Sequence, residues 1–345
     1  MLEKLIKERN LPPLQKKEEM IEILQQEEYG YIPPKPATIS WEIQEKIIPV
    51  FCAGKAILYK VTAHCMWNSN KCFSFPFYVS LPAKPGKHPF FIHVNFRNQI
   101  PDIYMPTEEL IDNGFAVLSF CYNDVTKDNE DFSDGLAGVL LDEEARAATA
   151  PGKIAMWAWA IHRVMDYAQT LGDVLDLKRS AVCGHSRLGK TALLAAATDE
   201  RIQYCYSNNS GCSGAAISRG KKGETVKDIC ERFPYWFCEN YKKYANNEQY
   251  MPFDQHYLLA CVAPRKLLVG SAALDIWADP ESEMLCCYAA SAAFDKGFIC
   301  NDRLPAIDDV YLDGDIGYHL RDGHHYFGRT DWHRMIQFMN KGCSA

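Results

Sequence analysis

The feature that most constrains the fold is an alternation of strand-like and helix-like segments in the second half of the chain. Residues 153–170 carry apolar side chains three and four positions apart, as in an amphipathic helix. After this segment, apolar runs typical of strands occur at 179–183, 202–206 and 266–273, and helical patterns at 188–197, 257–263, 281–294 and 330–340. Parallel strands need crossover connections, so the alternation predicts a mostly parallel central sheet with helices on both faces, a three-layer α/β sandwich.

The first half of the chain adds extended runs and a helical arm. Strand-like runs lie at 56–63, 73–81, 89–96 and 115–122. Residues 1–29 are charged and have a roughly helical period, which ends at Gly30. We therefore expect residues 1–35 to form an N-terminal helical arm packed on a larger body. Residues 207–255 are long and irregular, which favours loops that shape a binding site. With 345 residues we expect one domain over 1–345.

Charge and composition exclude several classes of protein. The net charge of −7 and the absence of any Lys/Arg run longer than two argue against a nucleic-acid partner. No stretch of 18 apolar residues occurs, so we expect no membrane span. The first twenty residues lack an apolar signal-peptide core, and many of the 14 cysteines lie in apolar runs, which favours buried free thiols and a cytoplasmic protein. We expect a monomer or a weak homo-oligomer.

The strongest chemical signal is Ser186, between a short apolar strand and a helix rich in Ala and Leu. The small Gly184 before it permits a strained turn that would expose the serine hydroxyl at a helix N-terminus, where a developing oxyanion is favoured. The usual G-x-S-x-G pattern is displaced, because Leu188 stands at its last position and the glycine is Gly189. A helix-capping serine beside a glycine is the structural alternative.

The same residues also match a phosphate-binding loop. Gly184 to Thr191 reads GHSRLGKT, which fits the pattern G-x-x-x-x-G-K-[ST]. Against a nucleotide-binding protein, the motif comes after the middle of the chain, and Arg187 and Leu188 crowd positions where the backbone would wrap phosphate. We keep this P-loop NTPase as an alternative that nucleotide binding with Mg²⁺ would test.

The order of a Ser-Asp-His triad predicts an acid and then a histidine after the serine. Asp275 directly follows the strand at 266–273, so we prefer it to Asp279, which suits a helix cap. His324 and His325 follow an Asp-Gly turn near the C-terminus and are the histidine candidates. A metal site of His319 with these two has no standard ligand spacing, so we expect no metal and no organic cofactor.

Several of these motifs together resemble the glucuronoyl esterases, carbohydrate esterases of the α/β-hydrolase superfamily that cleave esters of 4-O-methyl-glucuronic acid. The resemblance covers about residue 89 to the C-terminus. It rests on GHSRLGK at 184–190, SNNSG at 207–211, DIWADP at 275–280, Tyr318-His319 and His325. It implies an α/β-hydrolase fold, and it accounts for the displaced glycine, which members of the family share.

The resemblance also implies a role for each matching residue. Ser186 would attack the ester carbonyl, with His325 as general base and then acid. Arg187 would stabilise the oxyanion through its backbone N–H and its guanidinium. The residues implied to bind the sugar are Lys190, Glu224 and Trp277.

One position departs from the secreted fungal members. They carry a glutamate where this chain has Asn209. We therefore expect Asp275 to supply the acid, as in bacterial relatives.

We therefore expect a serine carboxylic ester hydrolase acting on uronate-bearing oligosaccharides or small esters. An acetylxylan-type deacetylase, in which the sugar is on the alcohol side of the ester, is the alternative within esterases. A catalytically inactive carbohydrate-binding protein is the alternative from another class. The aromatic run 233–237 could line the substrate site, but we favour its packing of the 207–255 segment onto the body.

Overall fold

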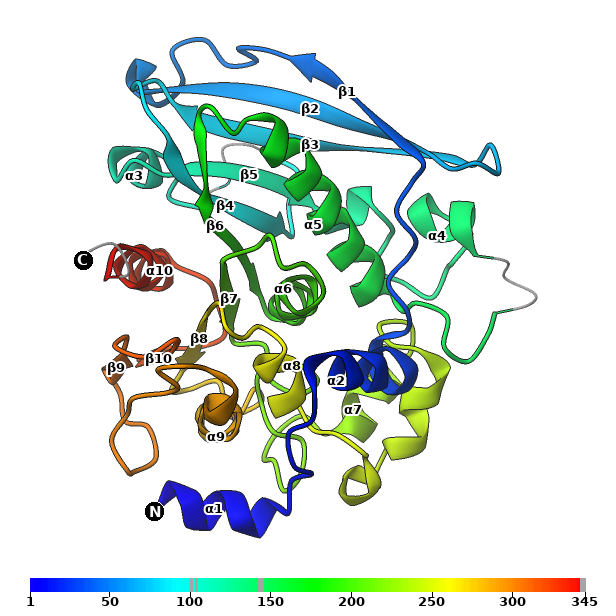
Figure 1. The fold of residues 1–345 in the computed structure, drawn as a ribbon, viewed down its shortest axis with the longest axis vertical. Coiled ribbons are helices and arrows are strands. Elements are labelled where there is room, and N and C mark those ends of the chain that lie inside the picture. The colour runs from blue at the N-terminus through cyan, green and yellow to red at the C-terminus, as the bar shows by residue number, and fades with distance from the viewer. Residues whose placement is uncertain (100–101, 103–104, 142–145, 342–345) are drawn as a thin grey trace.

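The computed structural model describes residues 1–99, 102, 105–141 and 146–341, and the strands found there form one sheet (Figure 1). The strand order is β1-β2-β3-β5-β4-β6-β7-β8-β10-β9. Strands β1, β2, β3 and β5 pair antiparallel, whereas the neighbours from β5 through β4, β6, β7 and β8 to β10 run parallel, and β9 closes the edge antiparallel. The carboxyl ends of the parallel strands therefore meet along one edge.

The strands are β1 (Thr38–Gln44), β2 (Ala56–Met66), β3 (Cys72–Pro82), β4 (His88–Asn95), β5 (Ala116–Cys121), β6 (Leu175–His185), β7 (Tyr204–Asn208), β8 (Lys266–Ala272), β9 (Val310–Tyr311) and β10 (Ile316–Arg321). The α-helices are α1 (Leu2–Arg9), α2 (Lys17–Leu24), α3 (Thr107–Asp112), α4 (Gly135–Leu140), α5 (Lys153–Thr170), α6 (Arg187–Thr198), α7 (Val226–Arg232), α8 (His256–Ala260), α9 (Pro280–Ala290) and α10 (Arg329–Lys341). Short helical turns are a π-helix at Gln25–Tyr29 and 3₁₀ turns at Phe51–Gly54, Tyr122–Asp124, Glu239–Tyr244, Glu248–Tyr250 and Ser291–Ala293.

Helices cover both faces of the sheet because the central strands are apolar on both sides. In β4 all side chains are buried; Phe90, Ile92 and Val94 belong to the larger core, which includes residues of α5, α6, α8 and α9. Phe91, on the opposite face of the same strand, packs in a second core with Trp332 and other residues of α10. Figure 1 shows α10 on one side of the sheet and α5 and α6 on the other. The expected three-layer arrangement and the mostly parallel centre are confirmed.

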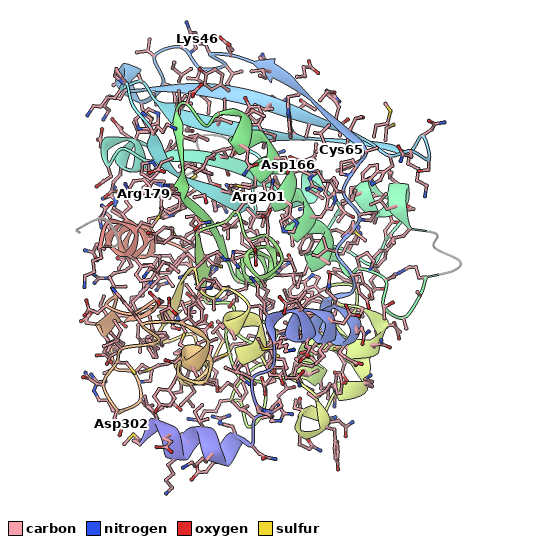
Figure 2. All side chains as sticks on the ribbon, viewed as in Figure 1. Lys46, Cys65, Asp166, Arg179, Arg201 and Asp302 are labelled. Atoms are coloured by element: carbon pink, nitrogen blue, oxygen red, sulfur yellow. The ribbon has the colours of Figure 1, made fainter. Side chains whose placement is uncertain are left out.

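The N-terminal arm consists of two α-helices followed by a π-helical turn. Helix α1 ends at Arg9 with Asn10 in the left-handed region, and the chain then passes through Pro12 and Pro13 before α2. Proline cannot donate its backbone nitrogen and disfavours a helical residue before it, so one helix could not continue. The start of α1 is fastened to Asp302, whose carboxylate accepts from the N-terminal amine at 2.5 Å and from the Leu2 amide at 2.8 Å (Figure 2).

Several elements were not predicted from the sequence: β1, β9, β10, α3 and α4. The irregular segment 207–255 is largely loop, as expected, but also holds α7, which begins at a capping box of Thr225 and Asp228. Helix α5 has the bounds that the apolar spacing predicted. Within the described ranges, we find no helix with the length and apolar content that crossing a membrane requires.

Candidate active site

Ser186 occupies a one-residue turn between β6 and α6. Its backbone lies at φ 57° and ψ −126°, a region that residues with a Cβ atom rarely adopt. The strand ends at His185 and the helix begins at Arg187, so the serine stands at the helix N-terminus. The first N–H groups of a helix have no intrahelical acceptor and can bind a developing oxyanion. The predicted strand–serine–helix turn is therefore present.

Two glycines make this turn possible and explain the displaced motif. A Cβ atom on Gly184 would lie 2.1 Å from the carbonyl oxygen of Leu188, so the first turn of α6 can approach the strand only if residue 184 is glycine. A Cβ atom on Gly189 would lie 3.0 Å from both Ser207 Oγ and Ser210 Cβ. The second glycine thus sits where α6 passes close to the end of β7.

The same geometry contradicts the phosphate-loop alternative. Gly184 belongs to β6 and Gly189 to α6, so the motif forms no loop that could surround a phosphate. Lys190 is 3% exposed and donates through Nζ to the backbone carbonyl of Ser210. The match to the P-loop pattern is therefore a coincidence of residue types.

The structure brings Asp275 and His325 together above the carboxyl ends of β8 and β10. Asp275 Oδ2 lies 2.6 Å from His325 Nδ1. Burial acts to raise the pKa of Asp275, but hydrogen bonds from His325 and Asn209 outweigh it and hold that pKa below its ordinary value. An ionised carboxylate at Nδ1 orients the imidazole and leaves Nε2 free to act as a base.

His325 lies next to the serine turn. Its ring centroid is 4.4 Å from that of His185, the residue that precedes Ser186. Burial lowers the pKa of His185 to about 3, and its Nδ1 lies 2.7 Å from Asn208 Oδ1. His185 therefore stays neutral in the usual working range, whereas the neighbouring His325 is held by the carboxylate of Asp275.

Asp279, the alternative acid, and His319, which was considered as a metal ligand, have other roles in the structure. Asp279 is the N-cap of α9: its side chain accepts from the Ser282 amide at 3.2 Å and from the Ser282 hydroxyl at 2.6 Å. His319 lies inside β10, 2.8 Å from the hydroxyl of Tyr206, and burial lowers its pKa to about 3. Among the described residues, no group of three or more His, Cys, Asp or Glu side chains is arranged to hold a metal ion.

The residues implied to bind the sugar gather around the loops after β7 and β8. Lys190 and Glu224 are both buried, and burial lowers the pKa of Lys190 while the carboxylate of Glu224 opposes that shift. The backbone N–H of Glu224 donates to the carbonyl of Trp277 over 3.0 Å, which joins the two loops. Trp277 is 44% exposed, and Arg232 Cζ lies 5.0 Å from its ring centroid.

Asp128 is a residue of this site that sequence reasoning missed. Its carboxylate accepts from the Arg187 guanidinium and, at 2.7 Å, from Trp236 Nε1. The aspartate lies in a polar loop after β5, 59 residues before Arg187, and no local pattern marks it. Trp236 and Phe237 of the aromatic run 233–237 are buried, so this run packs onto the body, and Trp236 does so against Arg187.

A solvent-accessible cavity of about 200 Å³ adjoins His325 on the β4 side. Its walls include His185, Phe96 and Phe327, and Arg97 and Asp102 at its polar end form a two-pronged ion pair with distances of 3.0 Å. The serine turn at the end of β6 therefore has this cavity on its β4 side and Glu224 and Trp277 on its β7–β8 side.

Comparison with known proteins identifies esterase relatives of this chain. A family model described as glucuronyl esterase, fungi, matches residues 65–296. Carbohydrate esterase MZ0003 from an unknown prokaryotic organism is 39% identical over 239 residues, which are 67% of this chain and 54% of that protein. The 4-O-methyl-glucuronoyl methylesterase of Hypocrea jecorina (strain QM6a) is 30% identical over 292 residues, 80% of this chain and 56% of that protein. The chain thus spans about half the length of these relatives.

Among solved structures, a glucuronoyl esterase from Solibacter usitatus superposes with a TM-score of 0.85 at 30% identity, covering 94% of this chain and 92% of that one. A promiscuous CE15 esterase from a marine bacterial metagenome superposes with a TM-score of 0.82 at 30% identity, covering 94% and 91%. The sheet order and the serine turn between β6 and α6 make this an α/β-hydrolase fold. Within that class, the chain belongs to the glucuronyl esterase family.

Proposed function

We propose that this chain is a serine esterase that hydrolyses esters of 4-O-methyl-glucuronic acid. The observation that carries the proposal is the hydrogen bond of 2.6 Å between Asp275 and His325, beside the strained turn that presents Ser186. The family membership and the relative named 4-O-methyl-glucuronoyl methylesterase support uronate esters as the substrate class.

The reaction follows the order of a serine hydrolase. His325 takes the proton of the Ser186 hydroxyl as Oγ forms a bond to the ester carbonyl carbon, and Asp275 stabilises the imidazolium. The oxyanion receives hydrogen bonds from the free N–H groups at the start of α6 and from Arg187. The C–O bond to the alcohol then breaks as His325 donates its proton to the leaving oxygen. Water, activated by the same imidazole, releases the uronic acid and restores the serine.

The two sides of the serine turn would hold the two halves of the ester. Lys190, Glu224 and the exposed face of Trp277 offer a cation, a carboxylate and an apolar surface, which together suit a hydroxyl-rich ring. The cavity beside His325 has the position needed for the leaving alcohol, because it lies on the opposite side, next to β4. In this arrangement the ester crosses the turn with its acyl carbon at Ser186.

The experiment compares hydrolysis of methyl glucuronate and of acetylated xylose by the wild type, by Ser186→Ala and by the exposed-serine control Ser133→Ala. We expect cleavage of the uronate ester, a loss of about 10⁴-fold or more in kcat for Ser186→Ala, and no change for the control. Cleavage of acetate alone would replace the substrate by an acetylated sugar and keep the serine. Activity that survives in Ser186→Ala would overturn the mechanism.

We also propose that the protein works in the cytoplasm. Most of the described cysteines are buried, and all of those described are free thiols, including the adjacent pair Cys286 and Cys287 in α9. Such thiols persist in a reducing compartment. Detection of the protein in the culture medium, but not in the lysate, of its native cells would contradict this placement.

A further inference from the structure

The carboxylate of Asp128 collects three donors from three separate segments. Oδ1 accepts from Trp236 Nε1 at 2.7 Å; Oδ2 accepts from the Tyr122 hydroxyl at 3.0 Å and from Arg187 Nη1. The Tyr235 hydroxyl also donates to the Asp128 backbone carbonyl at 3.2 Å. The side chain of Asp128 is 9% exposed. Asp128 therefore joins the loop after β5 to the segment that follows α7 and to helix α6, which begins beside Ser186.

Aromatic rings surround the guanidinium that Asp128 holds. Arg187 Cζ lies 4.6 Å from the ring centroid of Trp236, 5.2 Å from that of Phe233 and 5.8 Å from that of Phe96. Trp236 and Phe233 stack with parallel planes, 3.8 Å between centroids. Contacts of this kind restrict where a guanidinium can lie, and Asp128 fixes its rotation by accepting from one nitrogen at its edge.

Arg187 has a buried donor that lacks a protein partner among the described residues. Its Nε is buried and, among the described residues, has no hydrogen-bond acceptor. A buried donor left unpaired costs free energy, which is tolerated where a substrate supplies the acceptor. The next residue along the chain towards the N-terminus is Ser186, so an ester bound there would bring an oxygen close to this side chain.

We propose that Asp128 is a positioning residue: it holds the Arg187 guanidinium in the orientation that leaves Nε–H available to the oxygen of the ester as the oxyanion forms. The inference rests on the proposed esterase function. Asp128 itself touches neither the nucleophile nor the imidazole among the described contacts. Its contribution passes through Arg187 and through the aromatic rings that it fastens.

Removal of the Asp128 charge should change kcat in opposite directions, depending on whether Asp128 positions Arg187 or only compensates its charge. A carboxylate beside Arg187 weakens the positive potential at the oxyanion, so removing its charge alone would speed the reaction. If Asp128 acts by orientation, removing the charge slows the reaction. An amide at position 128 offers one acceptor oxygen in place of two and turns an NH₂ group towards a donor, so Asp128→Asn cannot satisfy Arg187, Tyr122 and Trp236 together.

The first experiment measures kcat and KM of the wild type and of Asp128→Asn on methyl glucuronate. We expect kcat to fall about 10- to 100-fold with KM changed less than threefold, because misplacement of a group that acts in the transition state reduces kcat. In an Arg187→Met background, Asp128→Asn should cost less than a further threefold, because the effect passes through Arg187. Asp131→Asn serves as the matched control, because Asp131 lies in the same loop but its carboxylate accepts from Ser133. An unchanged or faster kcat, or full additivity with Arg187→Met, overturns the inference.

A second readout needs no sugar substrate. The rate at which an alkyl fluorophosphonate labels Ser186 depends on the nucleophile and on the groups around the tetrahedral adduct. We expect Asp128→Asn to be labelled about tenfold more slowly than the wild type. If the wild type is labelled but does not hydrolyse the uronate ester, the proposed substrate is rejected, and the labelling rates still test the role of Asp128. No labelling of the wild type would overturn both proposals. If Asp128→Asn does not fold, Tyr122→Phe removes one donor with little change in volume; an unchanged kcat there would contradict the inference.

Discussion

Asn209 donates through Nδ2 to Oδ2 of Asp275 at 2.8 Å, the same oxygen that His325 approaches at 2.6 Å. The amide therefore occupies the space beside the acid and supplies a hydrogen bond that favours its ionised form. A carboxylate at position 209 would face Asp275 across this distance. Asparagine at position 209 therefore suits a chain in which the acid follows β8, because the amide donates to Asp275 and does not repel it.

This arrangement predicts a change in pH dependence for Asn209→Asp. Aspartate tolerates the left-handed backbone of residue 209, where φ is 47°. The added negative charge favours the imidazolium form of His325, which cannot act as a base, so the acid limb of the kcat/KM profile should move up by about one pH unit. Profiles of the wild type and of the surface variant Asn301→Asp provide the comparison. A shift to lower pH would contradict the arrangement described here.

The two aspartates of the loop after β8 should separate activity from stability. Asp275→Asn should reduce kcat by about 10⁴-fold with little loss of stability, because the imidazole loses its orienting carboxylate. Asp279→Ala should lower the free energy of unfolding by about 1–2 kcal/mol, because it removes the N-cap of α9. Kinetics and urea unfolding of both variants test this pair. Equal losses of kcat would reject the assignment of Asp275 as the acid.

The adjacent histidines should differ in the same way. His325→Ala should lose about 10³-fold or more in kcat, since it removes the base that Asp275 orients. The neighbouring His324 contributes its backbone carbonyl, which accepts from Arg321 at 3.2 Å, and this bond survives truncation of the side chain. We therefore expect His324→Ala to retain activity within about threefold. Steady-state kinetics of both variants test this prediction. A larger loss of kcat in His324→Ala than in His325→Ala would assign the role of base to His324.

The buried Glu28 should make stability depend on pH. Burial raises the pKa of this carboxyl from 4.5 to about 8, even though Gln255 donates to both of its oxygens. Below pH 4.5 both the folded and unfolded states keep the proton. Between pH 4.5 and 8 the unfolded chain releases it first, so the free energy of unfolding falls as the pH rises and stays low above 8.

Glu28→Gln removes this titration, so its thermal midpoint should fall less between pH 5 and pH 8 than that of the wild type. Some decline will remain, because burial raises the pKa of Glu283 to about 7. Glu27→Gln, a partly exposed neighbour paired with Lys243, is the matched control. If the thermal midpoint of Glu28→Gln falls between pH 5 and pH 8 as much as that of the wild type, the Glu28 carboxyl is not the source of the pH dependence.

Local patterns predicted much of the fold because the information lies within a few residues. The apolar spacing of residues 153–170 gave the bounds of α5, and the strand-like run at 266–273 corresponds to β8. Strand β10 was missed because its residues are buried on both faces and include Gly317, His319 and Arg321, so neither alternation nor a plain apolar run marks it. His319 consequently looked like a site residue, although it packs in the core beside Tyr206.

By itself, the sequence determined the serine turn. Gly184, Ser186 and Gly189 are close along the chain, and their steric limits dictate how a strand can pass into a helix there. Only the tertiary structure decided which distant groups meet at that turn. Asp275 and His325 are 50 residues apart and Asp128 and Arg187 are 59 apart. They come together because the parallel strands end along one edge of the sheet, where the loops that follow them converge on the serine.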